Sequence, residues 1–227
     1  MKIGLLAAGL VAGVCSSSFA GFIGWTAKVV NHGTYYTMDV FAAVDSSSDK
    51  VLNVFNMNIA AVGTTFTQGA GASNNKWRPN LGVSDISMND SFVTLGGFDD
   101  GGVYYCADGT SADPSFSNYA TSGATTIPAN AGWYNSDPTS SQILGADLSA
   151  FAGESRGVAA QYGVWVAHFA VSATSVTLDS RVDFSGKAAF NSGTNAFDSR
   201  SMFFIVPGPG ALALLGAAGL VSRRRRA

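Results

Sequence analysis

The sequence has few of the cysteine, histidine and charged residues on which most enzymes depend for catalysis. Its 227 residues include two cysteines and two histidines, and charged residues make up 12% of the chain. Cys15 lies in an N-terminal segment that we expect to be removed, so Cys106 would remain alone and no disulfide could form within the mature chain. His32, His168 and Cys106 lie on separate segments without ligand spacing, which disfavours a transition-metal site.

Basic residues are also scarce between residues 21 and 206. This part has fifteen acidic and eight basic side chains, an excess of seven negative charges. Nucleic-acid binding needs basic patches, so we expect no nucleic-acid partner. Fourteen of the fifteen acidic residues are Asp, which favours turns, and the chain has 27 glycines. This composition predicts turns between strands and therefore an all-β fold.

Alternation of apolar and polar residues with a period of two predicts a series of β-strands. Eight or more short strands without alternating helices favour a single antiparallel β-sandwich over residues 21–206, of jelly-roll or immunoglobulin-like type. We expect the first three strands to form a meander and the fourth and fifth to form a hairpin across Asp99 to Gly102. The predicted strands are 22–30, 35–44, 51–59, 91–98, 102–107, 162–172, 175–186 and 199–206.

Two segments carry further structural signals. In 162–172, Trp165 and Phe169 alternate on one face while Val166 and His168 alternate on the other, which predicts a central strand covered on both sides. The segment 107–142 is rich in Gly, Pro, Asn and Ser but contains aromatic residues. These features predict an ordered surface loop that packs on the body.

A Gly-x-Ser-x-Gly motif, the nucleophile elbow of serine hydrolases, occurs at Gly153 to Gly157 with Ser155 in the nucleophile position. The motif is weak in a chain this rich in Gly and Ser. It also needs a helix after it, whereas the following residues have a strand pattern, and the only downstream histidine is His168. We therefore expect Ser155 to be a turn residue and the protein not to be an enzyme.

Pairs of aspartates at expected turns leave a structural calcium ion as an alternative to having no cofactor. Carboxylates, hydroxyls and backbone carbonyls on loops are the hard oxygen ligands that Ca²⁺ prefers. No pair has the ligand ladder of an EF-hand, and solvated turn aspartates explain all of them. The pairs are Asp45 with Asp49, Asp99 with Asp100, and Asp108 with Asp113.

Aromatic residues among Asn and Asp indicate carbohydrate binding as a second possible role. Trp77 lies in NNKWRPN, and Trp133 and Tyr134 lie in NAGWYNSDP. Aromatic rings can stack on sugars while neighbouring amides and carboxylates bond to hydroxyls. The alternative is that these rings cover an edge of the core.

The first twenty residues have the pattern of a secretory signal peptide, with a single helix expected. Lys2 precedes the apolar run 3–14, and the small residues Ser18 and Ala20 match the peptidase recognition positions. We expect cleavage after Ala20. Val14 before Cys15 argues against a lipoprotein signal, which needs a small residue there.

The segment 206–227 reads VPGPGALALLGAAGLVSRRRRA. Pro207 and Pro209 would end the last strand. A run of thirteen residues without charge follows, from Gly210 to Ser222. As a short helix it would span about 20 Å, less than the hydrocarbon core of about 30 Å. The arginine cluster Arg223 to Arg226 is expected to stay on the cytoplasmic side of a membrane, which would place the body outside.

This order of a proline motif, a short apolar helix and an arginine cluster resembles the PEP-CTERM sorting domain that exosortases recognise. The resemblance covers about residues 206 to 227, of which 207–227 form the sorting tail, and has Gly208 where the name-giving Glu stands. It implies Pro207, Gly208 and Pro209 as the sorting motif, 211–221 as the transmembrane segment, and Arg223, Arg224, Arg225 and Arg226 as the stop signal.

The resemblance further implies a bacterial protein that is exported to a cell surface or extracellular matrix containing exopolysaccharide, with an exosortase as a partner. A plain membrane anchor without processing is the alternative for the tail. For the body we predict a structural or adhesive role, with a carbohydrate-binding module as the alternative and a secreted hydrolase built on Ser155 as the weakest.

Overall fold

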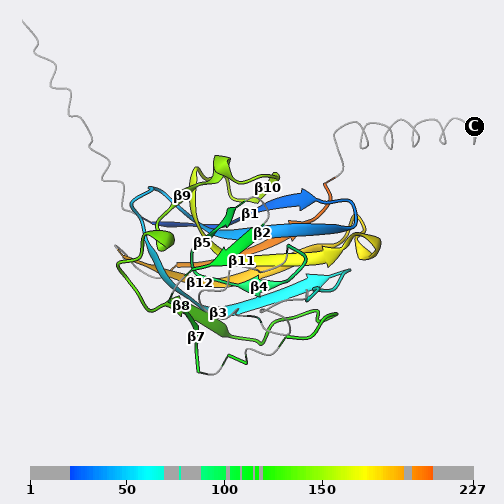
Figure 1. The fold of residues 1–227 in the computed structure, drawn as a ribbon, viewed down its shortest axis with the longest axis horizontal. Coiled ribbons are helices and arrows are strands. Elements are labelled where there is room, and N and C mark those ends of the chain that lie inside the picture. The colour runs from blue at the N-terminus through cyan, green and yellow to red at the C-terminus, as the bar shows by residue number, and fades with distance from the viewer. Residues whose placement is uncertain are drawn as a thin grey trace, which may run out of the picture.

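A computed structural model describes residues 21–68, 77, 88–100, 103–107, 109–114, 116–117, 120–191 and 196–206. This part is mostly β and contains two antiparallel sheets (Figure 1), which confirms the all-β class. The helices within it are single 3₁₀ turns, η1 (Ser141–Ile143), η2 (Leu148–Ala150) and η3 (Ala173–Ser175). The expected signal helix (1–20) and C-terminal helix lie outside the described residues.

The first sheet has the strand order β10-β1-β2-β11-β4, with β9 also paired to β11. The second has the order β13-β12-β3-β8-β7, and β5 pairs with β6 in a separate hairpin. The first sheet consists of β1 (Phe22–Asn31), β2 (Tyr35–Val44), β4 (Phe92–Val93), β9 (Ala146–Asp147), β10 (Glu154–Gly157) and β11 (Tyr162–Ser172). The other strands are β3 (Val51–Val62), β5 (Gly97–Asp100), β6 (Val103–Cys106), β7 (Thr110–Ala112), β8 (Ala131–Asn135), β12 (Arg181–Phe190) and β13 (Ala196–Phe203).

The two sheets share one hydrophobic core. Trp25 of β1 contacts Phe184 of β12 edge to face, with ring centroids 4.9 Å apart. Phe169 of β11 lies on the other side, 6.2 Å from the ring of Phe184. All three side chains are fully buried, and each buried aromatic ring stabilises the fold by about 1.5–3 kcal/mol. This burial holds the two sheets against each other.

Hydrogen bonds close the seam between β1 of the first sheet and β13 of the second. The backbone N–H of Trp25 donates to Asp198 Oδ2 at 2.8 Å, and its indole Nε1 donates to the Asp198 carbonyl at 3.1 Å. Gly24 permits this approach, because a Cβ at that position would lie 2.7 Å from Asp198 Oδ2. Arg156 Nε donates to the carbonyl of Phe203 at 2.9 Å and ties β10 to the same strand. The seam is therefore joined at several points along β13.

The two ends of the described chain lie at opposite ends of these strands. Trp25, near the start of β1, lies beside Asp198, whereas 29–31 at its other end line a pocket together with 204–206. Figure 1 shows the same arrangement, with the blue start of β1 and the orange end of the described chain far apart along the strand direction. The chain thus enters the body at one end and leaves it at the other.

The predicted meander of the first three strands is wrong. β1 and β2 pair as expected, but β3 belongs to the second sheet, where it pairs with β12 and β8. The reason is that β11 pairs along β2 from Tyr35 to Val44 and occupies its other edge. The turn at 45–50 consequently carries the chain from one sheet to the other.

Two other predicted elements differ in detail. The hairpin is present as β5 and β6, but Phe92–Val93 forms the separate strand β4 on β11. The predicted strand 175–186 begins only at Arg181, because Thr177 and Ser180 form a turn in which the Ser180 N–H donates to the Thr177 carbonyl at 3.1 Å.

β11 is a central strand, as predicted, and its residues 163–171 are all buried. The predicted division of its faces is wrong, because the register shifts between Trp165 and Ala167 and makes Val166 an extra residue. Val166 and Phe169 therefore both face the shared core, whereas Trp165 and His168 face the opposite side. Trp165 belongs there to a smaller cluster with Phe41, Phe92, Cys106 and Leu148.

Candidate functional site

The last four residues of the Gly-x-Ser-x-Gly motif form β10, an edge strand without a following helix. Gly153 and Gly157 have positive φ angles of +105° and +79°. A Cβ at Gly153 would lie 2.6 Å from the Val29 carbonyl oxygen, and one at Gly157 would collide with the Trp25 carbonyl. Both glycines therefore let β10 approach β1 closely, which explains their spacing without catalysis. Ser155 is exposed and lies in the strand rather than in the turn predicted for it.

Ser155 and His168 are far apart on the first sheet. The strand register places Ser155 opposite Lys28, Lys28 opposite Asp39, and Asp39 opposite His168. Three strand spacings separate Ser155 from His168, a distance of roughly 14 Å. The serine therefore has no hydrogen-bond contact with this histidine.

His168 is completely buried, and both of its ring nitrogens face hydrogen-bond acceptors. Nδ1 lies 2.6 Å from Asp39 Oδ1, and Nε2 lies 3.0 Å from the Met88 carbonyl oxygen. Burial lowers the pKa of His168, but the Asp39 charge and hydrogen bond, the Met88 carbonyl and the Asp90 charge outweigh it and raise the pKa above its ordinary value. Only the protonated ring can donate from both nitrogens, so this arrangement favours an ion pair with Asp39 and suits a structural role rather than that of a general base.

Two of the three proposed glycan contacts are buried. Trp133 of β8 is fully buried, and its Nε1 donates to the Thr94 carbonyl at 2.8 Å. Trp77 is 2% exposed and packs edge-on against Phe66. These positions contradict the prediction that Trp77 and Trp133 present their rings to a sugar, and Trp133 instead anchors the segment 107–142 to the core. Tyr134 is 38% exposed.

The aspartates considered for calcium do not form a cluster in the described part. Asp49 is buried and accepts a hydrogen bond from the Ser46 N–H at 3.1 Å, while Asp45 is exposed. The Asp113 carboxylate lies against Gly132 of β8. Within the described ranges, no three His, Cys, Asp or Glu side chains are grouped to hold a metal ion. The side chains of Asp99, Asp100 and Asp108 lie outside the described residues.

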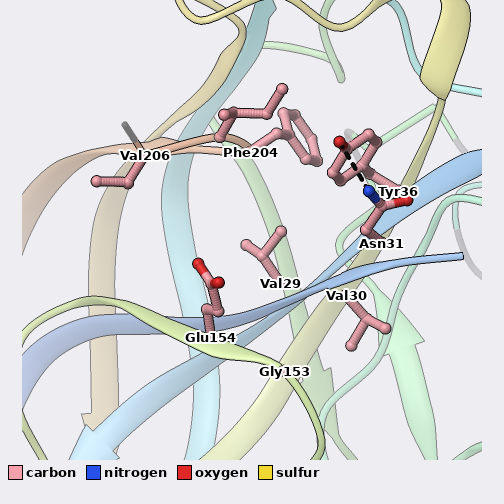
Figure 2. A pocket seen from close by; sticks show the side chains of 9 residues that line it. Val29, Val30, Asn31, Tyr36, Gly153, Glu154, Phe204 and Val206 are labelled. Atoms are coloured by element: carbon pink, nitrogen blue, oxygen red, sulfur yellow. Dashed lines mark hydrogen bonds between the residues drawn. The ribbon is translucent and has the colours of Figure 1, made fainter. Parts of the chain in front are cut away.

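A pocket of about 330 Å³ lies where the described chain ends (Figure 2). Phe204 is the last fully buried residue, with its ring 6.2 Å from that of Tyr36 and its N–H donating to the Ser180 carbonyl at 3.1 Å. Ile205 is half-buried, and Val206 is 54% exposed. The chain therefore reaches the surface within two residues of its last anchor. The pocket is lined by Val29, Val30, Asn31, Tyr36, Gly153, Glu154, Phe204, Ile205 and Val206.

Few of the residues that line this pocket are ionisable. Its ionisable lining residues are Tyr36 and Glu154, and the phenol oxygen of Tyr36 accepts a hydrogen bond from Asn31 Nδ2 at 3.0 Å. The Glu154 carboxylate pairs with Arg156 at 2.7 Å and is largely exposed. The lining residues provide no nucleophile with an adjacent base. The pocket combines valine and phenylalanine side chains with the polar groups of Asn31, Tyr36 and Glu154, as Figure 2 shows.

The residues that carry the sorting prediction lie outside the described part. They are Ala20, Pro207, Gly208, Pro209 and Arg223 to Arg226. A search of the described ranges finds no helix long and apolar enough to cross a membrane. The structure therefore describes the attachment point of the tail, at Val206, and the body before it.

The sequence interpretation missed one exposed aromatic residue, Phe197 of β13. It is 61% exposed on the side of the second sheet that faces away from the core. The predicted strand began at residue 199, although Phe197 continues the same alternation with Ser199 and Ser201. A predicted strand that began two residues earlier would have included Phe197 among its outward-facing residues.

Comparison of the chain with protein-family models, with curated proteins and with solved structures gives no match. A functional assignment therefore depends on the residues and the geometry of this chain.

Proposed function

We propose that the protein is an exported bacterial cell-surface or extracellular-matrix protein without enzymatic activity. Its body would be a single β-sandwich with a structural or adhesive role, and its tail would direct it to an exosortase. The observation that carries this proposal is the order of Pro207–Pro209, an apolar run and four arginines.

The position of Val206 supports the sorting role. The buried Phe204 ring and its backbone bond to Ser180 hold the end of the sheet, and the chain becomes exposed at Val206. A processing enzyme can thus approach the Pro207–Pro209 motif without pulling β13 out of the second sheet. An attachment point inside the core would have required partial unfolding before cleavage.

The proposed sequence of events follows from the charges and lengths of the two terminal segments. The signal peptide is removed after Ala20 as the body crosses the membrane. The apolar segment 211–221 is then held in the membrane with Arg223 to Arg226 on the cytoplasmic side. Because this segment is shorter than the hydrocarbon core, it suits a transient stay before cleavage near Pro209.

The proposal that the body is not an enzyme is supported by the geometry of its hydrolase-like motif. Both nitrogens of His168 are engaged, and Ser155 lies three strands away. The glycines of the motif serve the packing of β10 on β1. A secreted hydrolase built on Ser155 would need a general base within hydrogen-bond distance.

The test compares the exported full-length protein with a variant that lacks residues 207–227. We expect the full-length protein to reach the cell surface or matrix and its intact mass to show loss of the segment after about Pro209. The truncated variant should instead appear in the soluble secreted fraction. An unchanged distribution of the truncated variant would refute the sorting role, and a retained arginine terminus would support a plain anchor. Ser155→Ala, outside the tail, provides a control that should be sorted normally.

A further inference from the structure

We propose that the second sheet binds a polysaccharide with carboxylated sugars on its outer face, the side that points away from the shared core. This face is formed by neighbouring residues of β13, β12 and β3. The strand register arranges them in four rows across the sheet: Phe197, Lys187 and Phe55; Ser199, Ser185 and Asn58; Ser201, Asp183 and Ala60; and Phe203, Arg181 and Val62.

Aromatic rings lie at the two ends of this outer face. The Lys187 ammonium lies 6.0 Å from the centre of the Phe55 ring, and the Arg181 guanidinium lies 5.7 Å from that of Phe203. Phe197 and Phe203 are six residues apart on β13, about 20 Å along the strand. Each end of the face therefore combines an aromatic ring, which can stack on the apolar side of a sugar, with a cation.

The middle of the outer face is hollowed, and polar side chains of β3 and β12 border a recess whose lining is otherwise largely apolar. A groove of about 370 Å³ lies there between β12 and the segment 126–129, and Asn58, Asp183 and Ser185 are among its lining residues. Asp183 Oδ1 accepts hydrogen bonds from Arg181 Nε at 2.9 Å and from Ser201 Oγ at 2.6 Å.

Amide, hydroxyl and carboxylate groups of this kind bond to sugar hydroxyls. Sugar rings have apolar faces and hydroxyl-bearing edges, so aromatic rings at both ends and a largely apolar groove bordered by polar groups fit an elongated polysaccharide.

The charge of the outer face favours an acidic sugar. Asp183 is paired with Arg181, whereas no described carboxylate lies within salt-bridge distance of Lys187. Among the described residues Lys187 therefore has no carboxylate partner, and it lies between the rings of Phe55 and Phe197 in the strand register on a body with excess negative charge. A sugar carboxylate would complement it, and at physiological salt the distant acidic residues are screened beyond about 8 Å.

The test measures binding of the purified full-length protein to polygalacturonate and to its methyl ester at about 0.15 M salt. We expect polygalacturonate to bind more tightly, because esterification removes the charge that Lys187 complements. Phe197→Ala should weaken binding roughly five- to tenfold. Lys187→Met should remove the preference for the acidic polymer over its ester.

Matched controls lie on the first sheet. Ile23→Ala removes another exposed apolar side chain and Lys28→Met another cation, and both should bind like the unaltered protein. Absence of binding to both polymers, or unchanged affinity in Phe197→Ala with an unchanged thermal midpoint, would overturn the proposal. Equal affinity for the acid and the ester would overturn the role of Lys187. Because the assay uses purified protein, its failure is distinguishable from a failure of export or sorting.

Discussion

Asp39 and His168 form an ion pair inside the protein, with Oδ1 and Nδ1 2.6 Å apart on the neighbouring strands β2 and β11. Buried ion pairs are costly to desolvate, but the hydrogen bond from Nε2 to the Met88 carbonyl satisfies the second donor of the ring. The pair lies on the side of the first sheet that faces away from the shared core, where the ring of His168 stacks on Phe92.

The free energy of unfolding should fall as the pH rises above about 6.5. The pKa of His168 is higher in the folded protein than its ordinary value of about 6.5, so folding favours the protonated ring. This contribution is fully present below about pH 6.5 and is lost as the pH rises through the folded-state pKa. Urea unfolding at about pH 6 and about pH 9 should therefore give the lower free energy at the higher pH.

His168→Gln should reduce this pH dependence, whereas His32→Gln should retain it. His32 lies in the turn between β1 and β2, where its Nε2 is 3.0 Å from Thr37 Oγ1 and its ring stacks on that of Tyr35. Equal unfolding free energies of the unaltered protein at both pH values would contradict the assignment of a charged His168.

Asp39→Asn should destabilise the protein strongly. The substitution removes the negative charge but leaves the buried His168 ring and its neighbours in place, and breaking a buried ion pair in this way costs about 3 kcal/mol or more. Urea unfolding at about pH 6 measures the loss. Asp45→Asn, at an exposed turn position, should change stability by less than about 0.5 kcal/mol, and a similar effect of both substitutions would argue against the ion pair.

Gly157→Ala should destabilise the protein more than Gly123→Ala. Both glycines have positive φ angles, +79° and +88°, so both substitutions carry about 1 kcal/mol of backbone strain. A Cβ at Gly157 also collides with the Trp25 carbonyl, whereas one at Gly123 meets no atom of the described residues within 4 Å. Thermal unfolding should show at least about 1 kcal/mol of additional loss for Gly157→Ala.

Ser155→Ala provides the matched test within the same motif. Because Ser155 is exposed on an edge strand, its loss should change stability by less than about 0.5 kcal/mol. A large loss of stability for Ser155→Ala together with a small loss for Gly157→Ala would contradict the explanation that the motif's glycines serve the packing of β10 on β1.

Trp133→Ala should cost about 3–5 kcal/mol, the usual range for a buried Trp. The substitution leaves a cavity in the shared core and an unsatisfied Thr94 carbonyl. Tyr134→Ala, at the next and exposed position, should cost less than about 1 kcal/mol. Chemical denaturation of the two variants checks the contrast, and equal losses would contradict the burial of Trp133.

The sequence predicted strand positions well where turn residues bound an alternating segment. The segments 35–44 and 162–172 coincide with β2 and β11. Gly33 and Thr34 precede β2, Asp45 and Ser46 follow it, and Ser172 ends β11. The partners of a strand were harder to predict, because alternation specifies which residues share a face but not which strand lies alongside. This is why β3 was placed in the wrong sheet. The extra residue at Val166 has no sequence signal, and it reversed the predicted faces of half of β11.

The candidate sites were less predictable than the fold. Trp77 and Trp133 lie in polar segments, so their sequence context indicated exposure, although large aromatic rings stabilise a fold most when they are buried. Gly153 and Gly157 matched a catalytic pattern because catalysis and close strand packing both select glycine. The row of Phe197, Lys187 and Phe55 depends on pairing between strands that are distant in sequence. Alternation within one strand does not predict such pairing.

The two ends of the described chain lie at opposite ends of the body, which has a consequence for an anchored protein. If the protein is held through the residues after Val206, Gly21 lies at the far end of β1, ten residues or about 33 Å away along the strand direction. In a body that stands with this end toward the anchoring surface, the second sheet would form a side face. Polymer chains between neighbouring copies would meet that face, and Gly21 would lie at the end away from the anchor.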